Sequence, residues 1–475
     1  MSLALCLAIP AAGALLIALL HRWPNLREAV SLGAAAALFL LVFTFIAPVM
    51  NGERPGLVLA EPLPGLALAF ELEPLGLLFA LIASGLWFVS GVYSIGYMRG
   101  NDEEHQTRFY VCFALAIASA IGVAFAGNLL TLYLFYEALT LVTYPLVTHH
   151  GDGEARSGGR TYLALLLASS LLLLLPAIAI TWWVAGTQTF TPGGILAGSV
   201  SGGAAAGLLA LYAFGIGKAA LMPIHRWLPA AMVAPTPVSA LLHAVAVVKA
   251  GVFAIVKVVV YVFGLDFSAD AFAWLPWVAG FTIIAASIVA LRADNLKRRL
   301  AYSTVSQLSY VVLAAAILTP LSLVGAVLHI AAHAFGKITL FFAAGAVYTA
   351  AHKTEVSQLD GVGRRMPWTF AAFGIGALSM IGLPPAAGFV SKWYMVSGAL
   401  AAEHWVALGV IVASTLLNAG YFLPIVYRAF FKEGSAATHG EAPVTMVAAM
   451  VTTAALTVAM FFWADLPLAL ARSLL

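Results

Sequence analysis

Six titratable side chains stand inside long apolar segments of this sequence, where water is not expected to reach them. They are one acid, Glu137, and five lysines, Lys218, Lys249, Lys257, Lys337 and Lys392. A charge at the centre of a bilayer costs at least about 2.5 to 3.5 kcal/mol, so such residues are expected to be functional. We assign catalytic proton transfer to Glu137, Lys218, Lys249, Lys337 and Lys392.

A lysine and a glutamate at membrane depth can act together as a proton switch. Burial disfavours the charged form of either group, and a nearby opposite charge favours it. An ion pair that opens and closes can therefore load and release a proton. Glu137 is the one mid-span acid, so we expect it to pair with Lys218. Lys257 lies near the end of its apolar run, and its ammonium reaching the headgroups by snorkelling is an open alternative.

Histidines extend this pattern. His329, His333 and Lys337 in HIAAHAFGKITLFF are spaced four residues apart, which places them along one face of a helix. Such a row can pass protons through intervening waters. His243 in LLHAVAVVKAG and His225 in PIHRWLP are further candidate relay members, although His225 also fits an interfacial position beside an arginine.

Metal binding is the competing interpretation of the two neighbouring histidines. The zinc pattern HExxH needs a glutamate after the first histidine, where this sequence has Ile330. Cys6 and Cys112 lie far apart in apolar runs and do not form a thiolate site. P-loop, dinucleotide and haem-attachment motifs are not found in the sequence. We therefore predict no metal, no cofactor and no redox or hydrolytic site in this chain, and leave open whether it serves a larger oxidoreductase complex.

Composition predicts that these side chains are held by transmembrane helices. Of 475 residues, 63% are hydrophobic and 9% charged, against about 25% charged in soluble domains. A crossing helix needs about 20 apolar residues. We predict a single all-α, polytopic membrane domain over residues 1–475, with the lipid bilayer and not nucleic acid as its surroundings. Its fourteen predicted spans are 3–20, 30–48, 75–97, 108–126, 128–148, 161–184, 204–229, 236–264, 275–292, 301–318, 321–350, 368–400, 406–430 and 443–465.

The positive charges predict an orientation. With the N-terminus outside, sixteen of the 23 lysines and arginines fall on inner loops or span ends, and only Arg54 and Arg472 fall outside. Positive charge collects on the cytoplasmic side of membrane proteins. We expect a multi-pass protein of the cell inner (plasma) membrane with both termini non-cytoplasmic. The first apolar run has no basic residue before it, so it is expected to be a retained helix.

Three spans are predicted to be interrupted. Pro223 breaks 204–229, Pro384-Pro385 breaks 368–400, and 321–350 carries polar residues and a glycine at its middle. Broken helices at membrane depth are tolerated where they line a cavity or are buried in protein. The first two breaks make helices 7 and 12 discontinuous.

Breaks five helices apart are typical of inverted repeats in transporters. We expect residues 108–264, helices 4 to 8, and residues 275–430, helices 9 to 13, to be two inverted five-helix repeats. The proposal depends on the positions of the breaks, since the two halves share no visible sequence identity.

From Phe109 to Phe431 the sequence resembles the antiporter-like subunits of respiratory complex I, Mrp cation/proton antiporters and membrane-bound hydrogenases. The resemblance rests on PIHRWLPAAMVAPTPVSALLHAVAVVKAG, DNLKRRLAYSTVSQLSYVV, HIAAHAFGKITLFFAAG and GLPPAAGFVSKWYM, in the family's order and spacing. It implies the fourteen-helix fold. It also implies half-channels and a central axis formed by Glu137, Lys218, Lys249 and Lys392, with His243, His329, His333 and Lys337 between them.

Within that family, LFYEALTLVTYPLV and the chain length look most like an Mrp D subunit, whereas APTPVSALLHA is more similar to larger Mrp and hydrogenase-type subunits. Lys392 argues against the complex I subunit type that carries an acid there. The resemblance implies a proton-translocating subunit with other membrane subunits as partners. A self-sufficient monovalent cation/proton antiporter and a scaffold subunit of a hydrogenase-like or carbon-uptake complex are the alternatives. Exchange for Na⁺ or K⁺ stays open, because lysine and histidine supply no oxygen cage for either ion.

Overall fold

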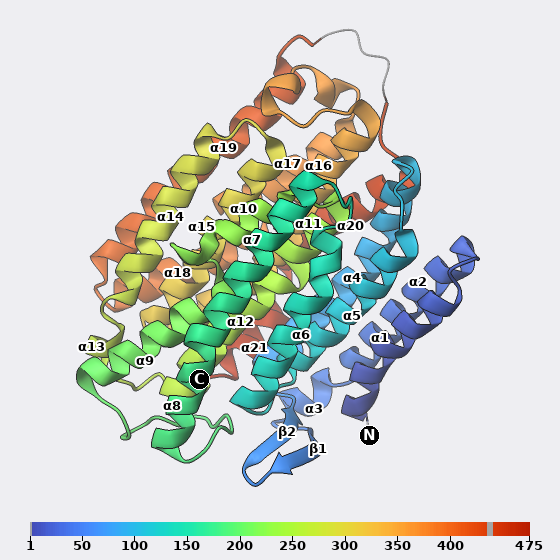
Figure 1. The fold of residues 1–475 in the computed structure, drawn as a ribbon. Helices are drawn as coiled ribbons and strands as arrows, with labels where there is room; N and C mark the ends of the chain where they lie inside the picture. The colour runs from blue at the N-terminus through green and yellow to red at the C-terminus, as the bar shows by residue number, and fades with distance from the viewer. Residues whose placement is uncertain (1, 435–439) are drawn as a thin grey trace.

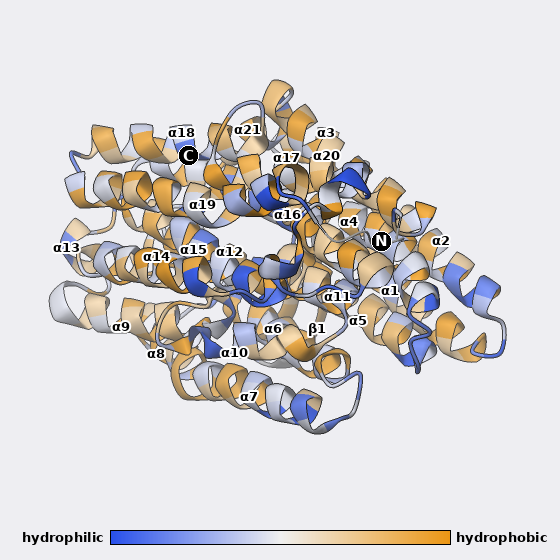
Figure 2. Ribbon diagram, turned by 90° about the horizontal axis from the view of Figure 1, so that it is seen from above, coloured by the Kyte–Doolittle hydropathy of each residue, from blue (hydrophilic) through white to orange (hydrophobic). Residues whose placement is uncertain are grey.

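The computed structural model describes residues 2–434 and 440–475 as a bundle of helices that run roughly side by side (Figure 1). Within these residues, eleven helical stretches are long and apolar enough to cross a membrane, and α9 and α17 are shorter apolar helices. Seen from one end, hydrophobic residues cover most of the helices, and hydrophilic residues gather at the near helix ends and loops (Figure 2). The all-α membrane class predicted from composition is confirmed.

The first part of the chain contains a β-hairpin that the sequence did not predict. Its strands are antiparallel and lie at the end of the bundle where α1 begins (Figure 1). The elements up to residue 263 are α1 (Ser2–Leu19), α2 (Pro24–Phe43), α3 (Ile46–Met50), β1 (Gly56–Leu63), β2 (Leu66–Glu71), α4 (Pro74–Gly100), α5 (Gln106–Ala124), α6 (Leu129–Val147), α7 (Gly153–Ser169), η1 (Ser170–Leu174), α8 (Leu175–Ala185), α9 (Gly202–Gly215), η2 (Gly217–Ala219), η3 (Ile224–Arg226), α10 (Trp227–Ala230), η4 (Ala231–Val233), α11 (Thr236–Ala240), η5 (Leu241–Val245), α12 (Val247–Val258) and η6 (Val259–Phe263).

The second part of the chain contains several long helices and ends in a short helix, α21. Its elements are α13 (Ala269–Phe272), α14 (Leu275–Arg292), α15 (Leu296–Ala316), α16 (Pro320–Ala351), η7 (Val356–Gln358), η8 (Val362–Arg364), α17 (Pro367–Ile381), α18 (Ala387–Ala401), α19 (Trp405–Phe431), α20 (Val444–Phe462) and α21 (Asp465–Arg472). Helix occupies each of the fourteen predicted ranges. The number of membrane crossings stays a prediction.

Two of the predicted helix breaks are present. Helix α9 ends at Gly215, and the chain passes through a left-handed residue, Ala220, at φ 56° before helix resumes beyond Pro223. Helix α17 ends at Ile381 and α18 begins at Ala387, on either side of the two prolines. A proline cannot donate the backbone hydrogen bond that a helix needs, which explains both positions. The predicted non-helical backbone at these two places is confirmed.

The third predicted break is wrong. Helix α16 runs without interruption from Pro320 to Ala351, with its one proline at the first position. Gly336 does not break it, because the missing side chain makes room for a neighbour: a Cβ there would lie 2.7 Å from Met380 Cε. Within the described residues, π-helical turns instead lie in the sixth span, where η1 separates α7 from α8, and in the eighth, where η5 separates α11 from α12. Such π-turns are frequent at functional sites.

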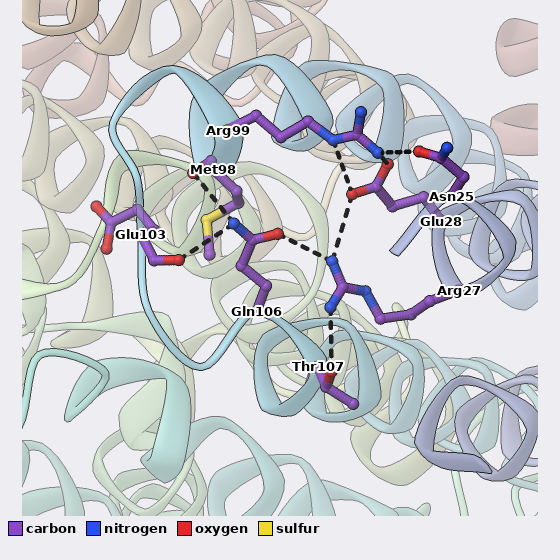
Figure 3. Close-up of polar contacts among 8 residues, drawn as sticks. All are labelled: Asn25, Arg27, Glu28, Met98, Arg99, Glu103, Gln106 and Thr107. Carbon is purple, nitrogen blue, oxygen red and sulfur yellow. Dashed lines mark hydrogen bonds and ion pairs between the residues drawn. The ribbon is translucent and has the colours of Figure 1, made fainter. Parts of the chain in front are cut away.

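A cluster of charged and polar side chains attaches the start of α2 to the last turn of α4 and the first turn of α5 (Figure 3). The Arg99 guanidinium donates to Glu28 over 2.5 and 3.2 Å, and Arg27 donates to Gln106 over 2.9 Å and to Thr107 over 3.0 Å. The side chains of Arg27 and Glu28 are each 5% exposed. The sequence-based span began at residue 30 and left these charges outside the helix, whereas α2 begins at Pro24 and includes them.

Candidate functional site

Lys218 is buried at the first helix break. Its Nζ donates to the Tyr136 carbonyl oxygen over 2.8 Å and to Thr140 Oγ1 over 2.6 Å, and lies 3.2 Å from the centre of the Tyr136 ring. The Tyr136 hydroxyl accepts from the Lys218 backbone N–H over 3.0 Å. The break therefore brings both the backbone and the side chain of Lys218 against α6. Helix α12 packs close behind, because a Cβ on Gly251 would collide with the Lys218 backbone.

Glu137 lies on α6 between the two residues that hold Lys218, yet the predicted ion pair is not formed in this structure. Within the described residues both carboxylate oxygens are buried and have no hydrogen-bond partner. Because an unpaired buried charge is costly, the charge on Glu137 depends on whether an ammonium approaches it.

Lys249 and His333 form a short polar contact between α12 and α16. Lys249 Nζ on α12 lies 2.5 Å from His333 Nδ1 on α16, and both side chains are buried. One nitrogen must accept for the other to donate, so the contact holds a single hydrogen between them. Each protonation event on one residue therefore affects the other.

His329, one turn before His333, is held by two side chains. Its Nε2 lies 2.9 Å from Gln307 Oε1 and its Nδ1 lies 2.9 Å from Ser391 Oγ. Gln307 Nε2 donates to the Met380 carbonyl over 3.1 Å, so Gln307 Oε1 faces the histidine. His329 Nε2 therefore carries a hydrogen and donates to this oxygen. Ser391 can turn its own hydrogen to the Gly388 carbonyl, 3.1 Å away. His329 can therefore take up a second proton and still have a partner for each ring nitrogen.

The second helix break exposes carbonyls that hold Lys392. Its Nζ donates to the carbonyl oxygens of Met380 over 3.1 Å and Ile381 over 2.9 Å, in the last turn of α17. The last carbonyls of a helix have no partner within it, so they are free to accept from side chains. Asn418 Nδ2 also donates to the Met380 oxygen over 3.2 Å. The Met380 carbonyl oxygen thus accepts from Gln307, Lys392 and Asn418.

Lys337 joins the same network from α16. Its Nζ donates to Ser303 Oγ over 2.8 Å. The Tyr421 hydroxyl lies 3.2 Å from Ser303 Oγ and donates to Asn418 Oδ1 over 2.5 Å. A continuous line of polar contacts therefore runs from Lys337 through these residues to the Met380 carbonyl, and from there to Lys392.

Two predicted relay members stand outside this network. His243 is buried in η5 with its ring 4.7 Å from that of Phe341, and within the described chain neither ring nitrogen has a partner. His225 is half-buried, and its ring centre lies 6.2 Å from that of Tyr302. Over residues 2–434 and 440–475, the structure contains no group of three His, Cys, Asp or Glu side chains suited to hold a metal ion.

Several network members were missed by the sequence-based prediction because they are neutral. Ser303 and Gln307 are four residues apart on α15, and Asn418 and Tyr421 are three apart on α19. Polar residues at helical spacing within an apolar span share one face. That spacing was the available signal, but a neutral side chain does not carry the large burial penalty that made the lysines visible.

Lys257 does not snorkel. It is 1% exposed, and its Nζ lies 3.3 Å from Glu73 Oε1 and donates to the Ala126 carbonyl over 2.7 Å. Glu73 is the N-cap of α4 and is 5% exposed. It lies just before the predicted span 75–97, so it was not counted among the buried acids. Glu137 remains the one acid within a predicted span, but Glu73 is a further buried acid at the start of a helix.

Comparisons with known proteins agree with this architecture. Residues 126–418 match the family model described as NADH:quinone oxidoreductase/Mrp antiporter, TM, and residues 65–110 match the N-terminus of NADH-ubiquinone oxidoreductase (complex I) chain 5. The chain is 36% identical over 345 residues to NADH-quinone oxidoreductase subunit N of Desulforudis audaxviator, covering 72% of this chain and 68% of that protein. It is 33% identical over 296 residues to the A/B subunit of a probable K⁺/H⁺ antiporter of Rhizobium meliloti, covering 61% of this chain but only 29% of the relative.

The fold is shared with a solved membrane complex. A chain in the structure of the Mrp complex from Dietzia sp. DQ12-45-1b superposes with a TM-score of 0.89 at 22% identity, covering 100% of this chain and 96% of that one. The protein is a multi-pass integral membrane protein. It belongs to the family of antiporter-like membrane subunits shared by NADH:quinone oxidoreductase and the Mrp antiporters.

Proposed function

We propose that this chain moves protons through the membrane by way of its buried glutamate, lysines and histidines. The observations that carry the proposal are the network around Met380 and the Lys249–His333 pair beside it. Lys249, Lys337 and Lys392 are buried on three different helices, and each hydrogen-bonds to neutral groups. A lysine with neutral acceptors can exist as ammonium or amine, whereas a firm ion pair would hold its proton in place. The network is therefore suited to proton exchange.

The proposed path has two parts. Glu137 and Lys218 load a proton in the first, and the second runs from Lys249 and His333 to Lys337 and Lys392. The ring centres of His329 and His333 are 6.1 Å apart, a gap that one water can bridge. Passage from Lys218 to Lys249 also requires water or side-chain movement, along the face where Gly251 packs on the break. His243, buried and without a partner in the described chain, is available on this segment.

The two breaks support the proposed inverted repeats. Residues 108–264 contain a break with Lys218 in it, and residues 275–430 contain a break whose free carbonyls hold Lys392. Each repeat would thus place one lysine at its interrupted helix. Superposition of the two halves tests this directly. A poor fit of α5 to α12 onto α14 to α19, after a half-turn about an axis in the membrane plane, would reject the repeats.

We further propose that the chain lies in the cell inner membrane with both termini outside the cytoplasm. The support is the placement of positive charge on the loops. Reporter fusions at residue 475 measure the orientation, and a cytoplasmic signal would reverse it.

Partner subunits of an Mrp-like or complex I-like assembly are the proposed surroundings, since the solved neighbour is part of such a complex. A self-sufficient cation/proton antiporter is the second candidate, supported by the named K⁺/H⁺ antiporter relative. A scaffold role is disfavoured because a scaffold does not need buried charges, and all four family-matched positions carry them.

The test uses Glu137→Ala, Lys218→Ala and the double variant, with Glu154→Ala, at an exposed position in the first turn of α7, as control. Proton transport is measured in inverted vesicles, and assembly is checked separately. Each single variant should lose transport, and the double variant should be no worse, because both changes remove one switch. Near-normal transport by correctly assembled Glu137→Ala would reject the mechanism.

A further inference from the structure

A polar cavity lies at the end of the bundle away from the β-hairpin (Figure 1). Helix α4 begins just after the hairpin and runs for 27 residues, about 40 Å, so Glu103, which follows it, lies at this far end. The cavity has a volume of about 390 Å³, and His150 and Glu154 at its rim are exposed to solvent. It has room for roughly a dozen water molecules at about 30 Å³ each. In the orientation proposed above, it faces the cytoplasm.

Glu103 and His150 meet at the mouth of this cavity. His150 Nε2 lies 3.3 Å from Glu103 Oε2, and His149 Nε2 lies 3.8 Å from the same oxygen. The side chain of His150 is 40% exposed, and that of Glu103 is 11% exposed. Figure 3 shows the Glu103 carboxylate pointing away from the arginines that bind Glu28. The carboxylate is therefore available to the histidines.

A histidine beside a carboxylate can take up a proton from water and pass it on near neutral pH. The ordinary pKa of histidine is about 6.5, and the contact with Glu103 raises the pKa of His150. The carboxylate holds the imidazolium until a cavity water accepts its proton, which returns the imidazole to the neutral form. The titratable and charged groups around His150 at this mouth are Glu103, His149, Asp152, Glu154, Lys297 and Lys353.

The floor of the cavity lies where α11 and α16 pack together. Thr236, the first residue of α11, and Ala344 on α16 line it and are 2% and 5% exposed. A Cβ on Gly345 would lie 2.8 Å from Thr236 Cγ2, so the two helices are in close contact there. Lys297, in the wall, donates from Nζ to the Ala234 carbonyl over 2.5 Å and so attaches α15 to the chain just before α11. The cavity thus ends at the meeting point of three helices.

Two of these helices lead from the floor to titratable groups. Thr236 precedes His243 by seven residues, and Ala344 follows Lys337 by seven, which is about 10 Å along a helix in each case. The His243 ring lies 4.7 Å from that of Phe341, one turn after Lys337 on α16. The distance between the cavity and the buried network is therefore covered by residues that the proposed proton path already includes.

We propose that Glu103 and His150 form a proton-collecting pair, and that the cavity behind them is the port through which protons pass between the solution at this end and the network. His150 exchanges a proton with bulk water on one side and with cavity water on the other, and Glu103 holds the charged form. Each proton that enters from the solution leaves towards His243 and Lys337, so the pair is regenerated. This inference rests on the proposed function and adds the site at which it exchanges protons with the solution.

Transport by the full chain in vesicles, at pH 6 and pH 8, tests the pair, with imidazole as a mobile buffer on the side that the cavity faces. His150→Gln and Glu103→Gln should each transport protons at least about tenfold more slowly than wild type at pH 8, where hydronium is scarce, and approach wild type at pH 6. Imidazole should restore the rate at pH 8, because it enters the cavity and carries protons itself.

Glu154→Gln is the matched control for this test. Glu154 also lines the mouth, but within the described residues the ion pairs of His149 and His150 on the cavity side are with Glu103. Glu154→Gln should therefore transport like wild type at both pH values. Wild-type rates in His150→Gln and Glu103→Gln at pH 8, or a loss that imidazole does not restore, would overturn the proposal.

A chemical label tests the cavity without any transport. In a chain that carries Cys6→Ala and Cys112→Ala, the further variant Ala344→Cys should react with a cationic, membrane-impermeant methanethiosulfonate added on the cavity side. Ala346→Cys, two residues further along α16 at a position 0% exposed, should not react. Equal reaction at both positions, or none in Ala344→Cys, would overturn the proposed port.

Lys249→Met separates this inference from the proposed function. Its block lies beyond the cavity, so it should lose transport at both pH values, and imidazole should not restore it. Labelling of Ala344→Cys should be unchanged when Lys249→Met is added. Normal transport by Lys249→Met, together with a loss in His150→Gln that imidazole restores, would reject the proposed path through Lys249 and leave the port standing.

Discussion

Lys249 and His333 meet across α12 and α16 with Nζ and Nδ1 2.5 Å apart, in a place where neither reaches water. The two residues come from separate halves of the chain, so a proton that passes between the halves can pass through this contact. The pair holds one hydrogen in common, and it therefore acts as a unit and not as two independent bases.

Replacement of either residue should interrupt transport. Lys249→Met and His333→Leu should each lower the rate of proton transport by at least about tenfold, and the double variant should show the same loss, because effects within a unit do not add. Lys432→Met, at an exposed lysine, is the control. Additive losses in vesicles that contain equal amounts of protein would show that the two residues work separately.

Thr140 should matter to Lys218 through a single hydroxyl. Thr140→Val keeps the shape and removes the acceptor 2.6 Å from Nζ. Loss of one buried partner costs about 1 to 3 kcal/mol, so we expect lower thermal stability together with slower transport. Thr452→Val, at a hydroxyl that bonds only within its own exposed helix turn, should change neither quantity. Unchanged transport in Thr140→Val would mean that the Tyr136 carbonyl alone holds the ammonium.

Close packing at the first break gives a steric prediction. In Gly251→Ala the new methyl group must push α12 away from the backbone of Lys218, which should impair transport and lower stability. Gly207→Ala, on α9, has no atom within 4 Å of the added methyl, and helical alanine is favoured over glycine by about 0.5 to 1 kcal/mol. The first variant should therefore melt at lower temperature than wild type and the second at the same or a higher one. Equal melting temperatures would show that the break adapts to the methyl group.

The loop after α6 should make stability depend on pH. Burial lowers the pKa of His149 to about 4, against the opposing effect of Glu103, with Arg108 and His150 also nearby. Below its ordinary value of 6.5 the unfolded chain binds the proton more readily than the folded one. The contribution of His149 to the free energy of unfolding is therefore complete above pH 6.5 and is lost as pH falls towards 4. The pKa of His150 shifts in the opposite direction, since its hydrogen bond to Glu103 raises it.

Melting temperatures in detergent between pH 7.5 and 4.5 measure this. His149→Leu should flatten the fall on the acid side, whereas His105→Gln, at a side chain 61% exposed, should leave the profile unchanged. An identical acid-side slope in His149→Leu would assign the pH dependence to other groups.

Glu28 should stabilise the attachment of α2. Glu28→Gln leaves the arginines Arg27 and Arg99 without their carboxylate. Because the Arg99 side chain is 47% exposed and can turn to water, we expect a loss of about 1 to 3 kcal/mol, below the 3 to 5 kcal/mol of a fully buried pair. Thermal unfolding measures it, with Glu104→Gln, 90% exposed, as control. A Glu28→Gln variant as stable as the control would show that Asn25 and Gln106 suffice.

Local chemistry explains which parts of the fold could be predicted. The length of apolar runs located the helices, and the prolines at 223 and 384 located two breaks, because a proline acts on its own backbone. Gly336 was misjudged because its effect depends on Met380, forty-four residues away, which fills the space that a side chain would take. Whether a glycine loosens a helix or allows a neighbour to approach is decided by tertiary packing.

The candidate site could likewise be predicted only in part. Buried lysines are visible in a sequence because of their cost, but their partners are not. The carbonyls that hold Lys392 belong to backbone, and Gln307 and Asn418 are neutral side chains whose alignment depends on how α15 and α19 pack. The burial of Glu73 was not predicted because the β-hairpin before it, which turns the chain back into the bundle, has no strong signal in the local sequence.

The Met380 carbonyl has a further consequence. A carbonyl oxygen has two lone pairs, yet Gln307, Lys392 and Asn418 all donate to this one over 3.1 to 3.2 Å. The three donors therefore compete, and a stronger bond from one weakens the others. Gln307 leads to His329, and Asn418 leads through Tyr421 to Lys337. Deprotonation of Lys392 would strengthen both other bonds, and by thermodynamic reciprocity a change at His329 or Lys337 must alter the proton affinity of Lys392 to the same extent. A single backbone oxygen thus makes the occupancy of three distant bases one shared equilibrium.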